Sequence, residues 1–167
     1  KTAILKRFII LFLILSMSFT NFSSSNSILI GDLTKEELFS KDHKFYENYL
    51  SSEPYQFKKN IDLNGISVKI LFGTWCHDSQ REIPRFLRLL EDINMKPEMI
   101  SLIGLDYNKN EPLNRGEILE VRRSPTIIFY KNDIEIGRIE EAPKLALEGV
   151  GFVSVSLKEN LLFILNK

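Results

Sequence analysis

Apolar residues return at helical spacing in two parts of the chain. Residues 33–50 place Leu38, Phe45, Tyr46 and Tyr49 on one face. Thr34 with Glu37 has the spacing of a capping box, so we predict a helix from Leu33 to Leu50. The second pattern, between Ile83 and Ile93, predicts a helix that begins just after Trp75 and is kinked at Pro84.

Other segments have the composition of strands. Residues 57–63 and 67–73 lie on either side of Asn64-Gly65, a dipeptide suited to a tight turn, so they predict a hairpin. The run 68–72 is nearly continuous in apolar residues, as in an interior strand. A further strand is expected within 98–108, and two strands joined near Asn132-Asp133 within 124–140.

The carboxyl-terminal part is less regular. We expect a short helix in 113–121 and a final helix from Leu157, whereas 149–156 fits either a strand or an irregular link. The order is then helix, strand, strand, helix, strand, short helix, strand, strand, helix. This order predicts the α/β class, with a central mixed β-sheet flanked by helices, and the 167 residues suit one domain.

The amino-terminal residues have the pattern of a secretory leader. Lys1, Lys6 and Arg7 precede the apolar block 8–19, and a polar Ser/Asn run follows. The block is shorter than the roughly 20 apolar residues of a membrane span, although an uncleaved anchor remains the alternative. We therefore expect a signal peptide at 1–27, cleaved near Ser25 or Ser27, and a domain at 28–167 that is exported to the periplasm or another extracytoplasmic space.

Charge and composition exclude several classes of function. The net charge is zero and no long basic run occurs, which argues against nucleic-acid binding. Residues 28–167 retain 19 basic and 22 acidic residues, a net charge of −3. Membrane contact is expected only through an uncleaved leader. The histidines, His43 and His77, form no Cys/His cluster with metal-ligand spacing, so neither a metal nor a bound cofactor is expected.

Cys76 is the only cysteine, so it forms no internal disulfide. A lone cysteine is commonly a small buried hydrophobic residue. Here it lies between a buried strand and a helix start, where free backbone donors and the helix dipole favour a thiolate. His77, if protonated, would add to this effect, Asp78 would oppose it, and Ser79 could donate a hydrogen bond to the sulfur.

Two motifs resemble the thioredoxin superfamily. The segment Trp75-Cys76-His77-Asp78-Ser79, followed by Pro84, resembles its active-site segment with serine in place of the second cysteine, a CxxS motif. The stretch "VRRSPTIIFYKNDIEIGR" resembles the cis-proline strand and following hairpin of that family, and "GLDYNKN" the end of its middle strand. The resemblance covers about residues 69–140 and implies a thioredoxin-like fold, with a cis-proline loop beside the start of the active-site helix.

The resemblance also implies roles for individual residues. A cis peptide at Ser124-Pro125 would set Pro125 against the Cys76 sulfur, while the main chain of Ser124 would pair with a client. Trp75 would form an apolar wall beside the thiol, and its alternative is an ordinary core aromatic. Arg122 and Arg123 could favour a thiolate or an anionic client such as glutathione, but a solvated basic pair is the simpler interpretation.

The chain departs from the family pattern at two positions. The buried acid of thioredoxins would align with Ile70, and the second cysteine with Ser79. Serine is a far poorer nucleophile toward sulfur than a thiolate, so reduction by an internal dithiol is excluded. The sequence predicts monothiol exchange with disulfide-containing proteins or small thiols, using glutathione or another external thiol. A redox-inactive binding or chaperone-like module is the alternative, and a thiol peroxidase is a weaker one.

Overall fold

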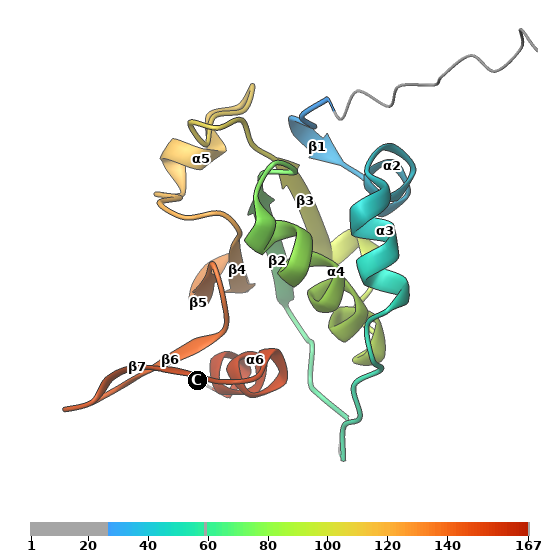
Figure 1. The fold of residues 1–167 in the computed structure, drawn as a ribbon. Coiled ribbons are helices and arrows are strands. Elements are labelled where there is room, and N and C mark those ends of the chain that lie inside the picture. The colour runs from blue at the N-terminus through green and yellow to red at the C-terminus, as the bar shows by residue number, and fades with distance from the viewer. Residues whose placement is uncertain (1–26, 59, 167) are drawn as a thin grey trace, which may run out of the picture.

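The computed structural model describes residues 27–58 and 60–166 (Figure 1). The predicted leader, apart from Ser27, lies outside the described residues. Among the residues that are described, no helix has both the length and the apolar character needed to cross a membrane. The elements, in chain order, are β1 (Gly31–Leu33), α2 (Lys35–Lys41), α3 (His43–Leu50), β2 (Ile66–Phe72), α4 (His77–Asp92), η2 (Pro97–Met99), β3 (Ile100–Gly104), α5 (Arg115–Ile118), β4 (Thr126–Lys131), β5 (Ile134–Glu140), β6 (Lys144–Leu147), β7 (Gly151–Ser154) and α6 (Leu157–Leu165).

Five strands form a mixed sheet in the order β1-β3-β2-β4-β5. β2 pairs in parallel with β3 and antiparallel with β4, while β1 and β5 add to the two edges in antiparallel fashion. The mixed sheet flanked by helices confirms the predicted fold class. Together with a helix directly after β2 and a cis peptide at Ser124-Pro125, it makes the fold thioredoxin-like.

The predicted hairpin across Asn64-Gly65 is wrong, because residues 57, 58 and 60–63, the described part of the first run, form no strand. Both edges of β2 are already occupied by β3 and β4, so no backbone donors or acceptors remain for a preceding strand. Residues 57–63 instead cover the core with Phe57, Ile61 and Leu63. The apolar character of that run comes from this packing rather than from strand pairing.

The predicted helix at 33–50 consists of two helices. The capping box of Thr34 and Glu37 begins α2, as the sequence indicates. Asp42 then adopts extended backbone angles, ends α2, and accepts a hydrogen bond from the backbone N–H of Lys44 at the start of α3. The break arises because the Asp42 side chain satisfies backbone donors that a continuous helix would use internally.

Helix α4 runs through Pro84 without interruption. Proline has no N–H to donate to the carbonyl of Gln80, four residues earlier. The side-chain amide of Asn48, on α3, donates to that carbonyl at 2.7 Å. A neighbouring helix thus supplies the hydrogen bond that Pro84 removes.

The two faces of the sheet are covered differently. Leu38 of α2, Phe45 of α3, Phe86 of α4 and Leu161 of α6 share one apolar cluster with the residues of β2 that face them. The opposite face holds a smaller cluster, in which Leu71 of β2 packs with Val121, just beyond α5. Figure 1 shows the short α5 beside the sheet and α2, α3 and α4 grouped on the other side.

The segment that the sequence left open, 149–156, contains β7, which pairs only with β6 in a separate two-stranded sheet. α6 follows with a capping box of Ser156 and Glu159. The turn between β4 and β5 lies where it was predicted. Asn132 and Asp133 both have positive φ, as the tight turn of a two-residue hairpin requires. Strand β1 was not predicted from the sequence.

Candidate functional site

Cys76 lies at the N-cap position of α4, four residues after β2 ends at Phe72. Its backbone is extended, and its carbonyl accepts the N–H of Gln80 in the first helical turn. The side chain is partly exposed, which excludes the interpretation as a buried hydrophobic residue. The strand-to-helix connection therefore presents the thiol at the amino end of a 16-residue helix.

Ser124 joins the segments around the sulfur. The Cys76 thiol donates to the Ser124 carbonyl with Sγ and O 3.1 Å apart. The Ser124 hydroxyl oxygen accepts the N–H of Gly73 at 2.9 Å and lies 3.0 Å from the hydroxyl of Ser79. The peptide from Ser124 to the buried Pro125 is cis. The end of β2, the start of α4 and the loop before β4 thus meet at one residue.

The expected hydrogen bond from Ser79 to the sulfur is absent from this site. Ser79 is fully buried, and its hydroxyl pairs with that of Ser124. Its position on α4 turns it toward the sheet, whereas Cys76 precedes the helix. Ser79 therefore bonds to the Ser124 side chain rather than to the thiol.

Trp75 lies beside the thiol in a fixed orientation. Its indole N–H donates to the carbonyl of Leu105 at 3.0 Å, and its ring covers Gly73, where an added Cβ would approach it to 2.3 Å. The ring of Tyr107 packs against it in a tilted arrangement, with 4.9 Å between ring centroids, and Tyr107 is 64% exposed. Trp75 is half-buried, which differs from a fully buried core aromatic, and its role as an apolar wall beside the thiol stays a prediction. The sequence analysis missed Tyr107, although "GLDYNKN" pointed to its loop.

The charged residues near Cys76 are largely paired with one another. Asp78 forms an ion pair with Arg81 at 2.7 Å, and His77 is exposed on the first turn of α4. Arg123 pairs with Glu141 at 3.1 Å, and Arg122 is exposed. Among the described residues, the hydrogen bond of the Cys76 sulfur goes to Ser124 and not to His77, Asp78, Arg122 or Arg123.

Thr74 and Gln80 hold the loop before Cys76, and neither role was predicted from the sequence. The Gln80 side-chain amide donates to the carbonyl of Thr74 at 2.8 Å. The Thr74 hydroxyl accepts the N–H of Leu29, ahead of β1, at 3.3 Å. These contacts tie the loop to α4 and to the segment ahead of β1.

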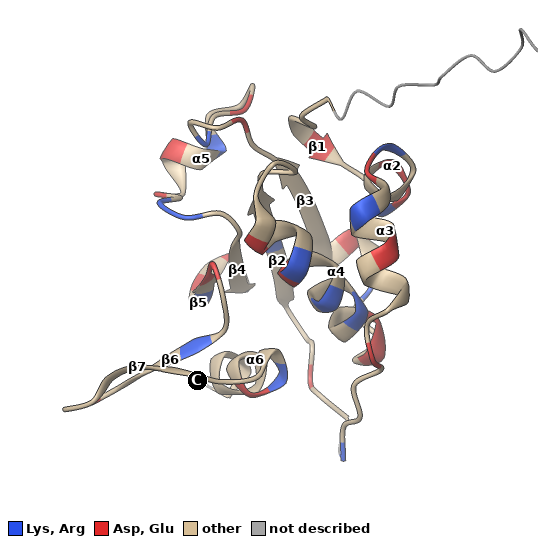
Figure 2. Ribbon diagram, viewed as in Figure 1, with Lys and Arg blue, Asp and Glu red and all other residues tan. Residues whose placement is uncertain are grey.

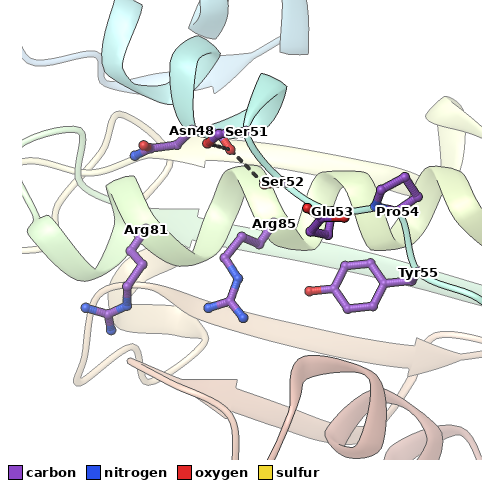
Figure 3. A pocket seen from close by; sticks show the side chains of 8 residues that line it. All are labelled: Asn48, Ser51, Ser52, Glu53, Pro54, Tyr55, Arg81 and Arg85. Atoms are coloured by element: carbon purple, nitrogen blue, oxygen red, sulfur yellow. Dashed lines mark hydrogen bonds between the residues drawn. The ribbon is translucent and has the colours of Figure 1, made fainter.

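A cavity of about 440 Å³ lies between the end of α3 and α4 (Figure 3). Figure 3 shows Arg81 and Arg85 side by side on α4, with Tyr55 from the segment after α3. Both arginines pair with Glu82, whose side chain is buried, at 2.7 and 3.4 Å. Since their charges are balanced and no predicted site residue lines this cavity, it does not belong to the thiol site.

Comparisons with known proteins give little more. No family model matches the chain, and no curated protein matches it. A solved structure that resembles it is the X-ray structure of Fasciola hepatica thioredoxin, 22% identical, which covers 46% of this chain and 69% of its own with a TM-score of 0.36. A likeness at this level carries no argument about activity.

Among the described residues, no group of three or more metal-ligating side chains could hold a metal ion.

Proposed function

We propose that the chain is an exported, thioredoxin-like monothiol protein that performs thiol–disulfide exchange through Cys76. The observation that carries the proposal is the partly exposed thiol at the amino end of α4, bonded to the carbonyl that precedes cis-Pro125. A helix amino terminus favours an anion, which is the reactive form of a cysteine. Its clients would be disulfide-containing proteins or small disulfides.

The exchange has two steps. The Cys76 thiolate attacks one sulfur of a client disulfide, a new bond forms between Cys76 and that sulfur, and the other client sulfur leaves as a thiolate. A second thiolate then attacks the mixed disulfide and releases Cys76. Attack by the client's own thiolate isomerises the client without net reduction. When the attacking thiolate is glutathione or another small thiol, it bonds to the client sulfur and Cys76 leaves as a thiolate. A second small thiolate then attacks the disulfide between the small thiol and the client, which releases the reduced client and the disulfide of the small thiol.

The contacts of Ser124 give the exchange a structural basis. When Cys76 loses its proton, its hydrogen bond to the Ser124 carbonyl is lost, and this carbonyl becomes free to accept an N–H from an extended client. Ser79 is buried and bonded to Ser124, so it does not reach a mixed disulfide at Cys76. An external resolving thiol is therefore required.

The refolding of a protein with scrambled disulfides tests this function. The chain should accelerate recovery of the native client in the presence of glutathione, and Cys76→Ala should abolish the acceleration. A Ser101→Ala variant, changed at an exposed position outside the thiol site, serves as the matched control. Equal acceleration by Cys76→Ala and the parent would overturn the proposal.

A redox-inactive client-binding module is the second candidate. Two observations favour it. The Cys76 thiol donates its proton in a hydrogen bond to the Ser124 carbonyl, and Ile70 stands where thioredoxins have the buried acid. Capture of an unfolded client that survives Cys76→Ala would support this alternative, whereas capture that vanishes with the sulfur would exclude it. Export is tested separately, by the mass of the chain recovered outside the cytoplasm, which should lack residues 1–27.

A further inference from the structure

We propose that the β6–β7 hairpin, residues 144–154, is a docking arm for an extended apolar segment of the disulfide client. The inference deepens the proposed function and depends on it, because the client held by the arm is the one presented to Cys76. Figure 1 shows the hairpin projecting from the body of the molecule beyond β5 and α6.

The arm is apolar without contributing to the core. Leu147, Val150 and Phe152 are 48%, 72% and 74% exposed, and none belongs to either apolar cluster of the described residues. Apolar side chains that gather on an exposed element, rather than lying singly, are characteristic of interaction sites. A two-stranded hairpin is also only marginally stable in water by itself, so a partner would stabilise it.

The tip stands clear of the body. Gly149 and Gly151 have positive φ, and a Cβ added at either would meet no atom within 4 Å. The pairing of Ala146 with Phe152 and of Leu145 with Val153 places apolar residues on both faces of the hairpin. An extended segment could therefore lie along either face or pair with a free edge.

The base of the arm lies next to the thiol site. A client bound at Cys76 would therefore lie beside the arm, and for this reason we propose the client as the partner that the arm binds. β5 ends at Glu140 opposite Thr126, directly after cis-Pro125. The N–H of Glu141 donates to the carbonyl of Pro125 at 2.8 Å, and Ser124, on the other side of that proline, accepts the Cys76 thiol. The chain leaves for β6 three residues later.

The dimensions fit an ordinary extended segment. A strand advances about 3.3 Å per residue, so residues 141–147 span at most about 23 Å. A client cysteine at Cys76 would then bring residues about seven positions away to the tip of the arm.

The charge of the arm favours an apolar occupant. Glu148 is the only charged residue between Lys144 and Ser156, and the ammonium of Lys144 lies 5.3 Å from the ring centroid of Phe152. In Figure 2 most of the hairpin has the tan colour of uncharged residues, whereas α4 carries several charged positions. Electrostatic attraction to an acidic partner is therefore small, and apolar burial would supply the affinity.

The test compares the parent with the triple variant Leu147→Ser, Val150→Ser and Phe152→Ser. Two peptides of about twelve residues carry a cysteine activated as a mixed disulfide with thionitrobenzoate, which is released as a coloured thiolate. One has Phe, Leu and Val about seven residues from the cysteine, and the other has serines there. The triple variant should react about tenfold more slowly with the apolar peptide and unchanged with the serine peptide.

Ile134→Ser is the matched control. Ile134 is 71% exposed but lies at the start of β5, the end of the strand remote from Thr126, so its replacement should leave both rates unchanged. Equal rates of the parent and the triple variant with the apolar peptide would overturn the proposal. So would a parent dimer in sedimentation that the triple variant converts to a monomer, since the arm would then cover a second copy.

Binding without chemistry separates this inference from the proposed function. A fluorescent apolar peptide without cysteine should bind the Cys76→Ala variant, whose arm is intact. Its affinity should be about tenfold lower for a chain that carries Cys76→Ala together with the three serine substitutions. If the parent exchanges no disulfide yet this difference is observed, the proposed function fails while the docking arm stands. If exchange is observed without this difference, the arm is overturned and the function stands.

Discussion

The carbonyl and the hydroxyl of Ser124 together contact three residues of the candidate site. Its carbonyl accepts the Cys76 thiol, and its hydroxyl contacts both Gly73 and Ser79. The hydroxyl is the partner of a buried N–H at the end of β2, and leaving such a donor unpaired costs about 1–3 kcal/mol. Ser124 is thus both a structural link and a proposed contact for the client.

We predict that Ser124→Ala lowers the free energy of unfolding by about 2 kcal/mol, because it leaves the Gly73 N–H and the Ser79 hydroxyl unpaired. Ser79→Ala should cost less, about 1 kcal/mol, because Gly73 keeps its partner. Urea unfolding measures both, with the exposed Ser101→Ala as control. A Ser79→Ala variant that is less stable than Ser124→Ala would contradict this ranking.

At this scale the sequence predicted the position of Cys76 but not the partners of its neighbours. The spacing of apolar residues was enough to place Cys76 at a helix start, and the resemblance was enough to set cis-Pro125 beside it. The contacts of the Ser79 hydroxyl and of the Tyr107 ring could not be predicted, because their partners lie 45 and 32 residues away in sequence. Such pairings depend on tertiary packing rather than on a local pattern.

At the scale of elements, α3 and α4 are joined where Pro84 interrupts the helical hydrogen bonds. We predict that Asn48→Ala lowers stability by about 1–2 kcal/mol, because the buried carbonyl of Gln80 loses its donor. In a Pro84→Ala background, the new N–H at position 84 can bond to this carbonyl, so Asn48→Ala should cost about half as much or less.

A double-mutant cycle by urea unfolding gives this coupling, and Asn108→Ala, at an exposed position, is the control. Equal costs of Asn48→Ala in the two backgrounds would show that the amide acts independently of the proline.

The loop before α5 is tied to β1 by an ion-pair cluster that makes stability depend on pH. Arg115 bonds to the carboxylates of Glu111 and Asp32, and the hydrogen bond from Arg115 is the main cause that lowers the pKa of Glu111 from 4.5 to about 2. Because the folded pKa lies below the ordinary value, the carboxylate stabilises the fold above about pH 4.5. This contribution is lost as the pH falls toward 2.

Glu111→Gln should therefore lower stability at pH 7 by up to about 3 kcal/mol, with the two chains converging as the pH falls toward 2. Urea midpoints measured between about pH 2 and pH 7 provide the test. A difference between the chains that stays constant across this range would contradict the assigned titration.

Element boundaries show where local pattern was sufficient. The capping boxes of α2 and α6 and the turn at Asn132-Asp133 follow from adjacent residues, and the first and last of these were predicted. The hairpin at Asn64-Gly65 was wrong because strand pairing is decided by which edges are free. The break at Asp42 was missed because the apolar spacing continues across it, and only the capping side chain marks the end of the helix.

At the scale of the whole molecule, helices cover the two faces of the sheet unequally. The face near α5 carries polar residues as well as apolar ones, namely Ser67, Lys69 and Ser101. Part of that face therefore tolerates water, and one short helix is enough to cover its apolar part. The sequence predicted the mixed sheet and its flanking helices. It could not predict the projecting β6–β7 arm, because short apolar runs interrupted by glycines also fit an irregular link.

The central claim is that the fold makes Cys76 a reactive thiol. The most direct measurement is the rate of mixed-disulfide formation with oxidised glutathione at neutral pH, in the native chain and in the same chain unfolded in urea. We predict a native rate at least about tenfold higher, since the helix terminus favours the thiolate only when the chain is folded. A native rate equal to or below the unfolded rate would contradict the account.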